Sequence, residues 1–435
     1  MNLAHRIFHT TNGMEVLLIK RPEKYTVGFS LLINAGSIYE DKNTSGISHF
    51  FEHLFFTGTK TYPTEKALRK RQQEIGLSAG ARTDYDRIEA YGSFPKDETA
   101  NCLSVLKEMV FESLLQPQMI EKERNIILEE ERLRQDNNYV QLWNNVFAKR
   151  FQKNNTLQLP IEGTPETIIS ITKSQLMHFY KTHCTTANAT LVIGCSIDFE
   201  KLEKVVRSIF EPLPKSKKIK PPVFTNKHMS NQSIGVAYKQ TRQLYFLLSF
   251  PSYPGDDLYR SWKYGFVMDL LYEKLNQALR IEKGLVYELT SSSGYIPTKN
   301  TAFAYVQTSC DTENFSVVLA AVFQKINNMR KGKIDVGLFE RLRNTGNKTL
   351  PMNFDTLSGV MNWCTNTFYR EGKIYSPEEV IKARNRVTIE DLKRTARSLF
   401  EYKKLNVVVL GPMLEESVNE KVKKYLQKNA TLTNT

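Results

Sequence analysis

A chain of 435 residues is too long to fold around one hydrophobic core, so we expect two or more domains. Its apolar and charged fractions, 41% and 24%, are those of a soluble globular protein. The net charge of +14 is compatible with an anionic partner or with a lysine-rich surface. Because the basic residues are dispersed and no nucleic-acid motif is present, nucleic-acid binding is not predicted.

Signals for membranes and export are missing from the sequence. There is no apolar run of eighteen residues, and the first residues, MNLAHRIFHTTNGMEV, lack the layout of a signal peptide. We therefore predict no membrane association and a cytoplasmic location. The five cysteines are odd in number, scattered and without a C-x-x-C pair, which favours reduced thiols.

Strand-like segments occur in both halves of the chain, for example YTVGFSLLINAGS from Tyr25 and QLYFLLSFPSY from Gln243. They are mixed with long helical stretches and do not alternate strictly with them. The predicted fold class is therefore α+β, with each domain a mostly antiparallel sheet packed with helices.

The first helical segment of interest is TSGISHFFEHLFF, residues 44–56, for which we expect Thr44 or Ser45 as N-cap and Gly58 as the end. At about 100° per residue, the apolar side chains share one face of this helix. The opposite face carries three polar side chains within a sector of about 100°. They are His49, Glu52 and His53.

Two histidines at positions i and i+4 can bind one metal ion, and a glutamate beside them can deprotonate a water. The alternative is that all three side chains simply face solvent. With only seven histidines in the chain, a chance H-x-x-E-H is expected in roughly one of a hundred such sequences, which favours the metal site.

A zinc site needs a further protein ligand, and the helical segment 116–136 offers two candidates. Glu123 and Glu130 lie two turns apart, on one line within a predicted apolar stripe. A carboxylate that faces a core needs a cation, a metal or several donors. The alternative is a stripe near the surface, with Glu130 paired to Arg134.

The best domain boundary is a proline-flanked lysine cluster at 213–225, which is typical of an exposed linker. Similar helix–strand–helix patterns begin at Thr164 and Ser376. We therefore predict two related domains, 1–212 and 226–435, although such units also share generic patterns.

Together these segments resemble the pitrilysin/insulinase zinc metallopeptidases, whose H-x-x-E-H is the inverzincin signature. The resemblance is strongest to the branch with mitochondrial processing peptidase and bacterial processing-protease-like proteins. It covers essentially the whole chain. The matching segments are NAGSIYED, SGISHFFEHLFFTGT, ERNIILEEERLRQD, LPIEGTPETI and HFYKTHCTTANATLVIGCSID.

The resemblance implies one zinc ion per chain, held by His49, His53 and Glu130, with Glu52 as general base. It implies a supporting role near the metal for Glu123. In the second domain, ALRIEKGLVYELTSS resembles the segment that supplies an arginine–tyrosine pair for the substrate carbonyl and the oxyanion. That pair is Arg280 and Tyr287.

One departure concerns the strand to which the family's substrate is thought to add as an extra strand. Where the family commonly has Asn-Ala-x-Thr, this chain has Gly80-Ala81-Arg82-Thr83. The predicted substrate-binding residues are Gly80, Ala81 and Arg82. Without the asparagine side chain one substrate contact is lost, and Arg82 is expected to change the substrate preference. The second domain has no H-x-x-E-H and is predicted to be inactive.

The sequence thus predicts a zinc metalloendopeptidase that hydrolyses peptides or unfolded polypeptide segments. The resemblance implies a homodimer, or a heterodimer with a related subunit, with a peptide as substrate. The alternative is a noncatalytic scaffold or partner subunit of a related peptidase complex. A binding protein with a purely structural zinc would leave Glu52 and the arginine–tyrosine pair without a role.

Overall fold

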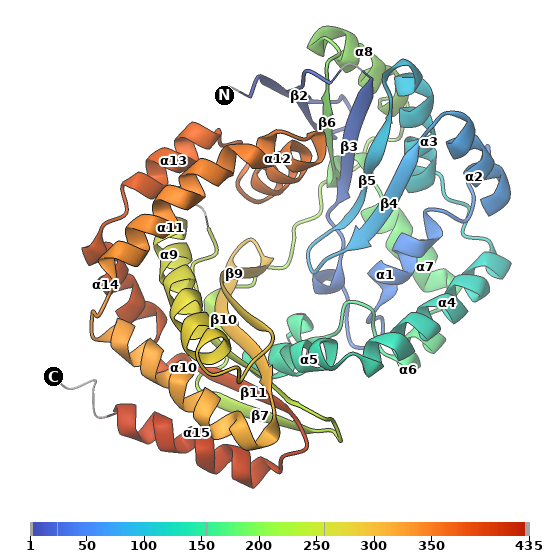
Figure 1. Ribbon diagram of the computed structural model, residues 1–435. Coiled ribbons are helices and arrows are strands. Elements are labelled where there is room, and N and C mark those ends of the chain that lie inside the picture. Colours follow the sequence, from blue (N-terminus) through green and yellow to red (C-terminus); the bar gives the residue numbers. More distant parts are fainter. Residues whose placement is uncertain (1–2, 24, 153–154, 256, 431–435) are drawn as a thin grey trace. The chain divides into compact units, whose positions relative to one another are not determined.

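The computed structural model describes residues 3–23, 25–152, 155–255 and 257–430. Its contacts divide the chain into two compact units, and each is described by itself. Unit 1 comprises Met1–Arg132, Leu159–Pro222 and Leu350–Pro377. Unit 2 comprises Leu133–Gln158, Val223–Thr349 and Glu378–Thr435. Both units combine one sheet with several helices, so the predicted α+β class is confirmed (Figure 1).

Unit 1 is built on a six-stranded sheet in which only β2 and β6 run parallel. The last strand in the order, β4, forms one edge of this sheet. In spatial order the strands are β1 (His5–His9), β2 (Glu15–Lys20), β6 (Ala189–Cys195), β3 (Thr26–Ile33), β5 (Ile88–Pro95) and β4 (Ser78–Thr83).

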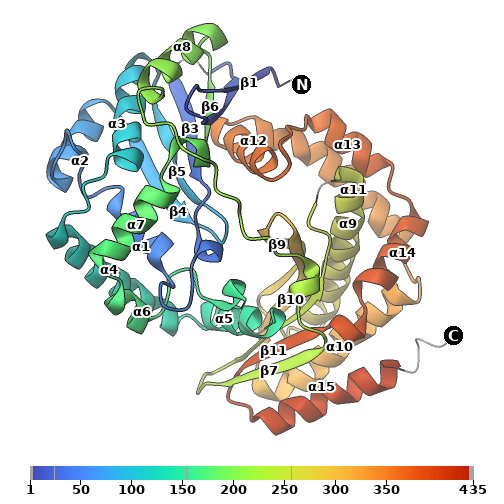
Figure 2. The same ribbon diagram turned by 180° about the vertical axis from the view of Figure 1, so that it is seen from behind.

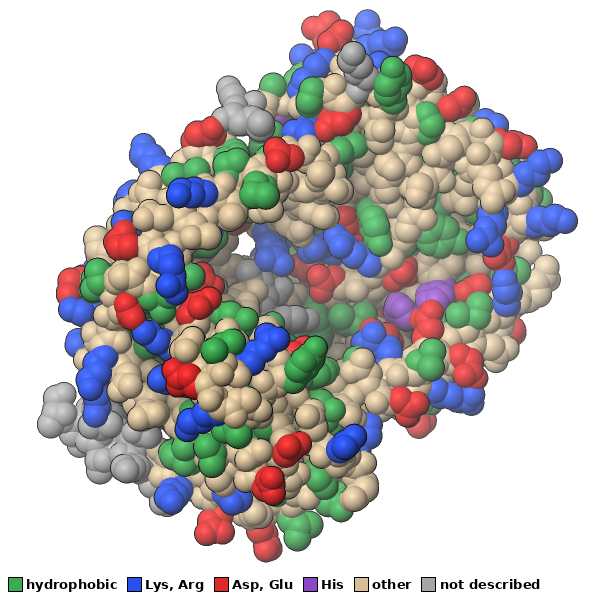
Figure 3. Space-filling model, viewed as in Figure 1, with side chains coloured by type: hydrophobic (Ala, Val, Ile, Leu, Met, Phe, Trp, Pro, Cys, Tyr) green, Lys and Arg blue, Asp and Glu red, His purple; other side chains and the backbone are tan. Residues whose placement is uncertain are grey.

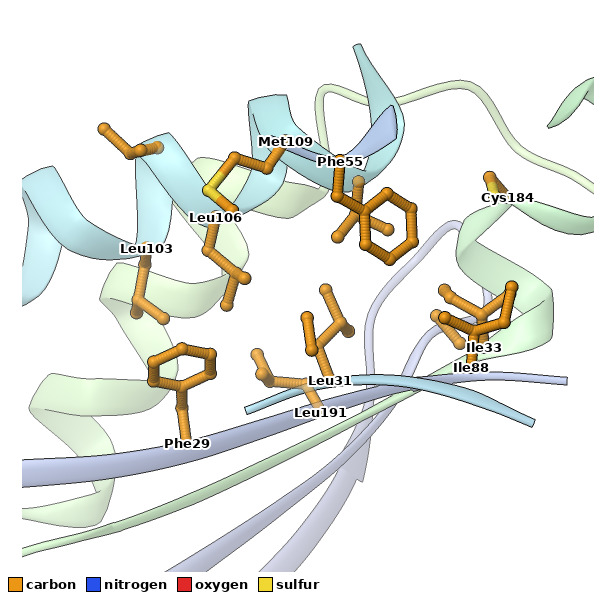
Figure 4. Packing of buried hydrophobic residues seen from close by; sticks show 14 of the residues in the cluster. Phe29, Leu31, Ile33, Phe55, Ile88, Leu103, Leu106, Met109, Cys184 and Leu191 are labelled. Atoms are coloured by element: carbon orange, nitrogen blue, oxygen red, sulfur yellow. The ribbon is translucent and has the colours of Figure 1, made fainter. Parts of the chain in front are cut away.

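The helices of unit 1 lie on both faces of this sheet. They are α1 (Ile47–Leu54), α2 (Glu65–Glu74), α3 (Thr99–Phe111), α4 (Pro117–Asp136, up to Arg132), α6 (Pro165–Ser170), α7 (Lys173–His183), α8 (Phe199–Phe210) and α12 (Leu357–Glu371). Alternate apolar residues of β3, such as Phe29 and Leu31, point into the core beside Leu103 and Leu106 of α3 (Figure 4). This core therefore fixes the helices on one face of the sheet, α1 among them.

The other face of the sheet receives α12, which contacts β6 and β3. Two glycines make this close approach possible, because a Cβ at Gly194 would lie 2.8 Å from the sulfur of Met361 and one at Gly28 would lie 3.0 Å from its Cγ. A larger residue at either position would push α12 away from the sheet.

Unit 2 contains a five-stranded sheet with one parallel pair, β7 and β11. Its strands, in spatial order, are β7 (Ser233–Tyr238), β11 (Asn406–Gly411), β8 (Leu244–Pro251), β10 (Thr301–Cys310) and β9 (Leu289–Thr298). Its helices are α5 (Asn138–Arg150), α9 (Leu258–Leu275), α10 (Phe315–Arg330), α11 (Val336–Thr349), α13 (Pro377–Asn385), α14 (Ile389–Leu399) and α15 (Glu415–Ala430). No helix in the described ranges is long and apolar enough to span a bilayer.

The two sheets share one plan. The order β2-β6-β3-β5-β4 has the same parallel and antiparallel pairs as β7-β11-β8-β10-β9. The two similar sequence patterns also give the same succession, α6, α7, β6 and α8 in one case and α13, α14, β11 and α15 in the other. This agreement supports the predicted duplication.

The compact units do not follow the ranges 1–212 and 226–435 that the sequence predicts for the two domains. Helix α5 lies within the first range but packs on β11, β7 and β8 of unit 2 (Figure 2). Helix α12 lies within the second range but packs on the sheet of unit 1. Each sheet is thus covered by a helix from the other half of the chain, while the domain boundaries stay a prediction.

A buried arginine attaches α5 to the sheet of unit 2. Arg150, the last residue of α5, is 0% exposed, and burial lowers its pKa to about 9. Its Nε and Nη2 donate to Ser249 Oγ at 3.2 and 2.7 Å, and its Nη1 donates to the Lys404 carbonyl at 3.0 Å. The side chain therefore satisfies polar groups that burial would otherwise leave without donors.

Replacing this arginine tests the anchoring of α5. Arg150→Ala leaves a cavity and removes the donors to Ser249 and Lys404, which is expected to lower the free energy of unfolding by about 2–5 kcal/mol. Urea unfolding followed by circular dichroism measures the effect. Arg132→Ala is the control, because its side chain is 70% exposed and its loss should change stability by less than about 0.5 kcal/mol. Equal stabilities of the two variants would contradict the assignment.

Candidate metal centre

Helix α1 places three polar side chains on one face and its apolar side chains in the core. Phe50, Phe51 and Leu54 are each 0% exposed. His49 and His53 lie on the opposite face, with side chains that are 14% and 15% exposed. The two-faced helix therefore has the arrangement that the sequence predicts, with the imidazoles accessible but largely sheltered.

The N-terminus of α1 differs from the expectation, because neither Thr44 nor Ser45 is the N-cap. Gly46 takes this position with φ 92°, and a Cβ there would lie 2.6 Å from the Glu162 carbonyl oxygen. The cap comes from Glu40, whose carboxylate accepts from the backbone N–H of Gly46 at 2.8 Å and of Ser48 at 2.9 Å. Burial raises the pKa of Glu40 to about 7 against the effect of these bonds.

The C-terminus of α1 also differs from the sequence prediction. The helix ends at Leu54 and is followed by a turn, in which Phe55 N–H donates to the Glu52 carbonyl, rather than continuing to Gly58. Both histidines still lie within the helical part, so the shorter helix leaves their spacing intact.

The nitrogen and oxygen atoms of His49, His53 and Glu130 converge on one point. The three possible ligand atoms all lie within 4.8 Å of one another. Glu130 Oε2 is 3.9 Å from His49 Nε2 and 3.5 Å from His53 Nε2. Neighbouring ligands of a tetrahedral zinc ion are separated by about 3.3 Å, so this set of donors fits zinc. Figure 3 shows histidine side chains beside acidic ones on one face of the molecule.

Glu123 lies behind His53 and fixes its ring. The distance from Glu123 Oε2 to His53 Nδ1 is 3.1 Å, which leaves Nε2 of the same ring facing Glu130. Burial alone lowers the pKa of His53, but the hydrogen bond to Glu123 and the charges of Glu130 and Glu52 outweigh it and raise the pKa. A carboxylate on the far nitrogen is the usual support of a zinc-binding histidine.

The predicted apolar stripe on α4 is only partly correct. Ile120 and Ile127 are buried, and so is Glu123, which is 7% exposed. Ile126 and Leu133, which helical periodicity also assigns to this stripe, are 37% and 71% exposed. The reason is that only a narrow line of α4 meets the core of unit 1. Beside it, the half-exposed Glu130 faces the two histidines instead of apolar side chains.

Glu52 is held by a residue to which sequence reasoning gave no role. Thr83 Oγ1, on β4, donates to Glu52 Oε2 at 2.5 Å. Burial raises the pKa of Glu52, and the Thr83 hydrogen bond only partly offsets this effect. A raised pKa makes the carboxylate a stronger proton acceptor, as a general base requires. The sequence signal for Thr83 is that it matches the last position of the family's Asn-Ala-x-Thr segment.

The predicted substrate-binding residues lie on the edge strand β4. Gly80, Ala81 and Arg82 pair only with β5, and no strand in the described ranges pairs with the other side of β4. Since Thr83 on the same strand contacts Glu52, this open edge runs directly past the candidate general base.

Arg280 and Tyr287 belong to unit 2. Arg280 lies in the π-helical turn Asn276–Ile281, and Gly284 ends this segment with φ 61°. Tyr287 is 82% exposed and precedes β9. The Arg280 guanidinium carbon lies 5.7 Å from the centre of the Tyr287 ring. The two side chains therefore form a pair, and their role toward a substrate stays a prediction.

An α+β protein with two histidines and a carboxylate converging beside a further glutamate has the donor set of a catalytic zinc site. Comparison with known proteins agrees. Residues 15–165 match the family model described as insulinase (peptidase family M16), and residues 170–345 match the peptidase M16 inactive domain. The chain belongs to the M16, or insulinase, family of peptidases.

Two relatives match nearly the full chain. An uncharacterized zinc protease of Rickettsia bellii is 25% identical over 411 residues, covering 92% of this chain and 96% of the relative. The mitochondrial-processing peptidase subunit beta of Dictyostelium discoideum is 23% identical over 404 residues, covering 88% and 83%. A protease from Helicobacter pylori has a solved structure with a TM-score of 0.84 at 16% identity, covering 95% and 100%. This last likeness concerns the fold.

Metal affinity tests the donor set. Glu130→Gln and His49→Ala should each abolish tight zinc binding, and Glu123→Gln should weaken it about 10–100-fold because the His53 ring loses its partner. Competition with a chromophoric chelator measures the affinities. Glu129→Gln is the matched control, since this neighbour on α4 is exposed and pairs with Arg132. An equal loss of zinc affinity in Glu129→Gln would contradict the assignment of Glu130 as a ligand.

Proposed function

We propose that the chain is a zinc-dependent metalloendopeptidase that hydrolyses peptides or unfolded polypeptide segments. The observation that carries the proposal is the convergence of two histidine Nε2 atoms on Glu130 Oε2 beside a sheltered carboxyl group, Glu52. Membership of the M16 family and relatives named zinc proteases support it.

In this proposal His49, His53 and Glu130 hold one zinc ion, and Glu123 orients His53. When bound, zinc supplies Lewis acidity, which polarises a carbonyl and lowers the pKa of a water. Glu52 is the general base. Thr83 occupies its Oε2, which leaves Oε1 to take the proton of the attacking water and to pass it to the leaving amine.

The substrate is proposed to bind as an added strand along β4. An open strand edge offers main-chain donors and acceptors to an extended peptide of almost any sequence. Gly80, Ala81 and Arg82 provide this edge next to Thr83 and Glu52. Because the recognition uses the main chain, it requires a peptide or an unfolded segment rather than a folded protein.

The proposed assembly is a homodimer or a heterodimer with a related subunit. Its support is the name of several relatives, which are subunits beta of a processing peptidase. The alternative, a noncatalytic partner subunit, is less consistent with this chain, because the ligand atoms, Glu52 and its Thr83 partner are all in place.

The Glu52→Gln variant tests the mechanism. Its amide cannot take up the proton of the water, so kcat for a quenched peptide should fall by about 10²–10⁴-fold. Zinc content should remain that of the wild type, because Glu52 is not among the converging ligand atoms. Undiminished cleavage by this variant would refute the role of Glu52. Failure of the zinc-loaded wild type to cleave a diverse peptide library would refute the enzyme assignment.

A second pair of variants tests the arginine–tyrosine pair. Arg280→Met and Tyr287→Phe should lower kcat by about 10–10³-fold through loss of oxyanion stabilisation, while zinc affinity stays unchanged. Peptide cleavage and chelator competition are measured side by side. Lys283→Met and Tyr238→Phe serve as controls, because Lys283 is an exposed cation of the same turn as Arg280 and Tyr238 is exposed on β7. If the controls lose as much activity, the pair has no special role.

A further inference from the structure

The edge strand β4 presents different chemistry on the two faces of the sheet. Side chains alternate along a strand, and Thr83 points toward Glu52 on α1. Its neighbour Arg82 therefore points to the opposite face. There it lies directly across from Glu89 of β5, its partner in the register.

A cavity of about 520 Å³ opens on that opposite face, between the sheet and α12. Its walls come from β3, β4, β5 and α12, all of them parts of unit 1. Polar side chains of the cavity lining include Ser30, Arg82, Glu89, Tyr91, Asn362 and Thr365.

Arg82 is held rigidly at this cavity without being covered. Its Nε and Nη2 donate to Glu89 Oε2 at 2.9 and 2.6 Å, and its guanidinium lies 5.2 Å from the centre of the Tyr91 ring. The side chain is nevertheless 47% exposed. Among the described residues, Arg82 Nη1 has no hydrogen-bond acceptor, so two N–H groups remain for a ligand.

The Glu89 carboxylate binds only one side of the Arg82 guanidinium and also accepts from another side chain. This carboxylate is 2% exposed and also accepts from Ser30 Oγ at 2.5 Å. A second arginine, Arg87, approaches the same Oε2 to 3.9 Å. Arg87 pairs more closely with Asp86, at 3.5 Å, and with Asp84, at 3.7 Å. The group that faces the cavity is therefore the Arg82 guanidinium, whose Nη1 is not bound by Glu89.

The wall formed by α12 adds a further donor. Thr365 lines the cavity and is 2% exposed. Within the described ranges its Oγ1 has no hydrogen-bond partner. A buried hydroxyl group without a partner is costly, and a carboxylate that enters the cavity would satisfy it.

We infer that this cavity is a specificity site that accepts an acidic side chain of the substrate, with Arg82 as the specificity-determining residue. The inference rests on the proposed binding of a peptide along β4. In that arrangement every second side chain of the peptide lies on the Arg82 face. The opposite preference, a basic side chain that displaces Arg82 from Glu89, is disfavoured because it would break both hydrogen bonds between them.

The test compares peptides that differ only by Glu, Gln or Lys at each position around the cleaved bond. The wild type should cleave the Glu peptide about tenfold faster in kcat/KM than the Gln peptide at one such position, as expected for a charge-assisted hydrogen bond. Arg82→Gln should bring this ratio close to one. Arg82→Glu should favour Lys. Thr365→Val, which keeps all charges, should lower the ratio partially.

Arg69→Gln is the matched control, because it removes the same charge from an exposed position on α2 and should leave the ratio unchanged. Zinc content and circular dichroism verify that each variant is folded. A Glu-to-Gln ratio of one at every position in the wild type, an unchanged ratio in Arg82→Gln, or a preference for Lys in the wild type would overturn the inference.

Peptide affinity, measured without cleavage, tests the specificity site independently of the proposed peptidase activity. Labelled peptides are titrated with zinc-loaded Glu52→Gln protein, and Kd is measured by fluorescence anisotropy. Tighter binding of the Glu peptide, lost on adding Arg82→Gln, supports the specificity site even if the wild type cleaves no peptide, an outcome that would refute only the peptidase. Equal Kd for the Glu and Gln peptides at every position refutes the specificity site alone.

Discussion

The structure depends on the crowding of three carboxyl groups around two imidazoles. Glu52, Glu123 and Glu130 all act on His53, and together they raise its pKa although burial lowers it. Such a cluster concentrates negative charge in a sheltered place, and a divalent cation is the natural way to stabilise it. Burial in the same sheltered place is the main reason that the pKa of Glu52 is raised, and the charge of Glu130 adds a smaller contribution.

The position of this cluster is set by the contacts of α1. Its phenylalanine face packs in the core of unit 1, its N-terminus is held by Glu40, and its outer face meets Thr83 of β4. These contacts join the helix to three separate parts of the chain. A short helix of eight residues would not be stable by itself, so its geometry comes from this surrounding structure.

The sequence predicted what depends on local periodicity. The separation of His49, Glu52 and His53 from the apolar face of α1 follows from 3.6 residues per turn and is observed. The predicted N-cap of α1 was wrong. The N-terminal N–H groups are bound by Glu40, which precedes the helix in a segment without a recognisable capping pattern. The sequence also did not predict on which sheet α5 and α12 pack. An apolar helix face shows that a helix is packed against another element, but it does not identify that element.

The alternation of side chains along β4 separates two tasks that many enzymes combine in one pocket. Thr83 faces the metal centre and holds the base, while Arg82, one residue away, faces the cavity beneath α12. A change at Arg82 therefore leaves the hydrogen bond to Glu52 intact. Because α12 comes from the far end of the chain, residues such as Thr365 can change the shape of the cavity without touching the zinc ligands. Preference and chemistry can then vary independently on the two faces of one strand.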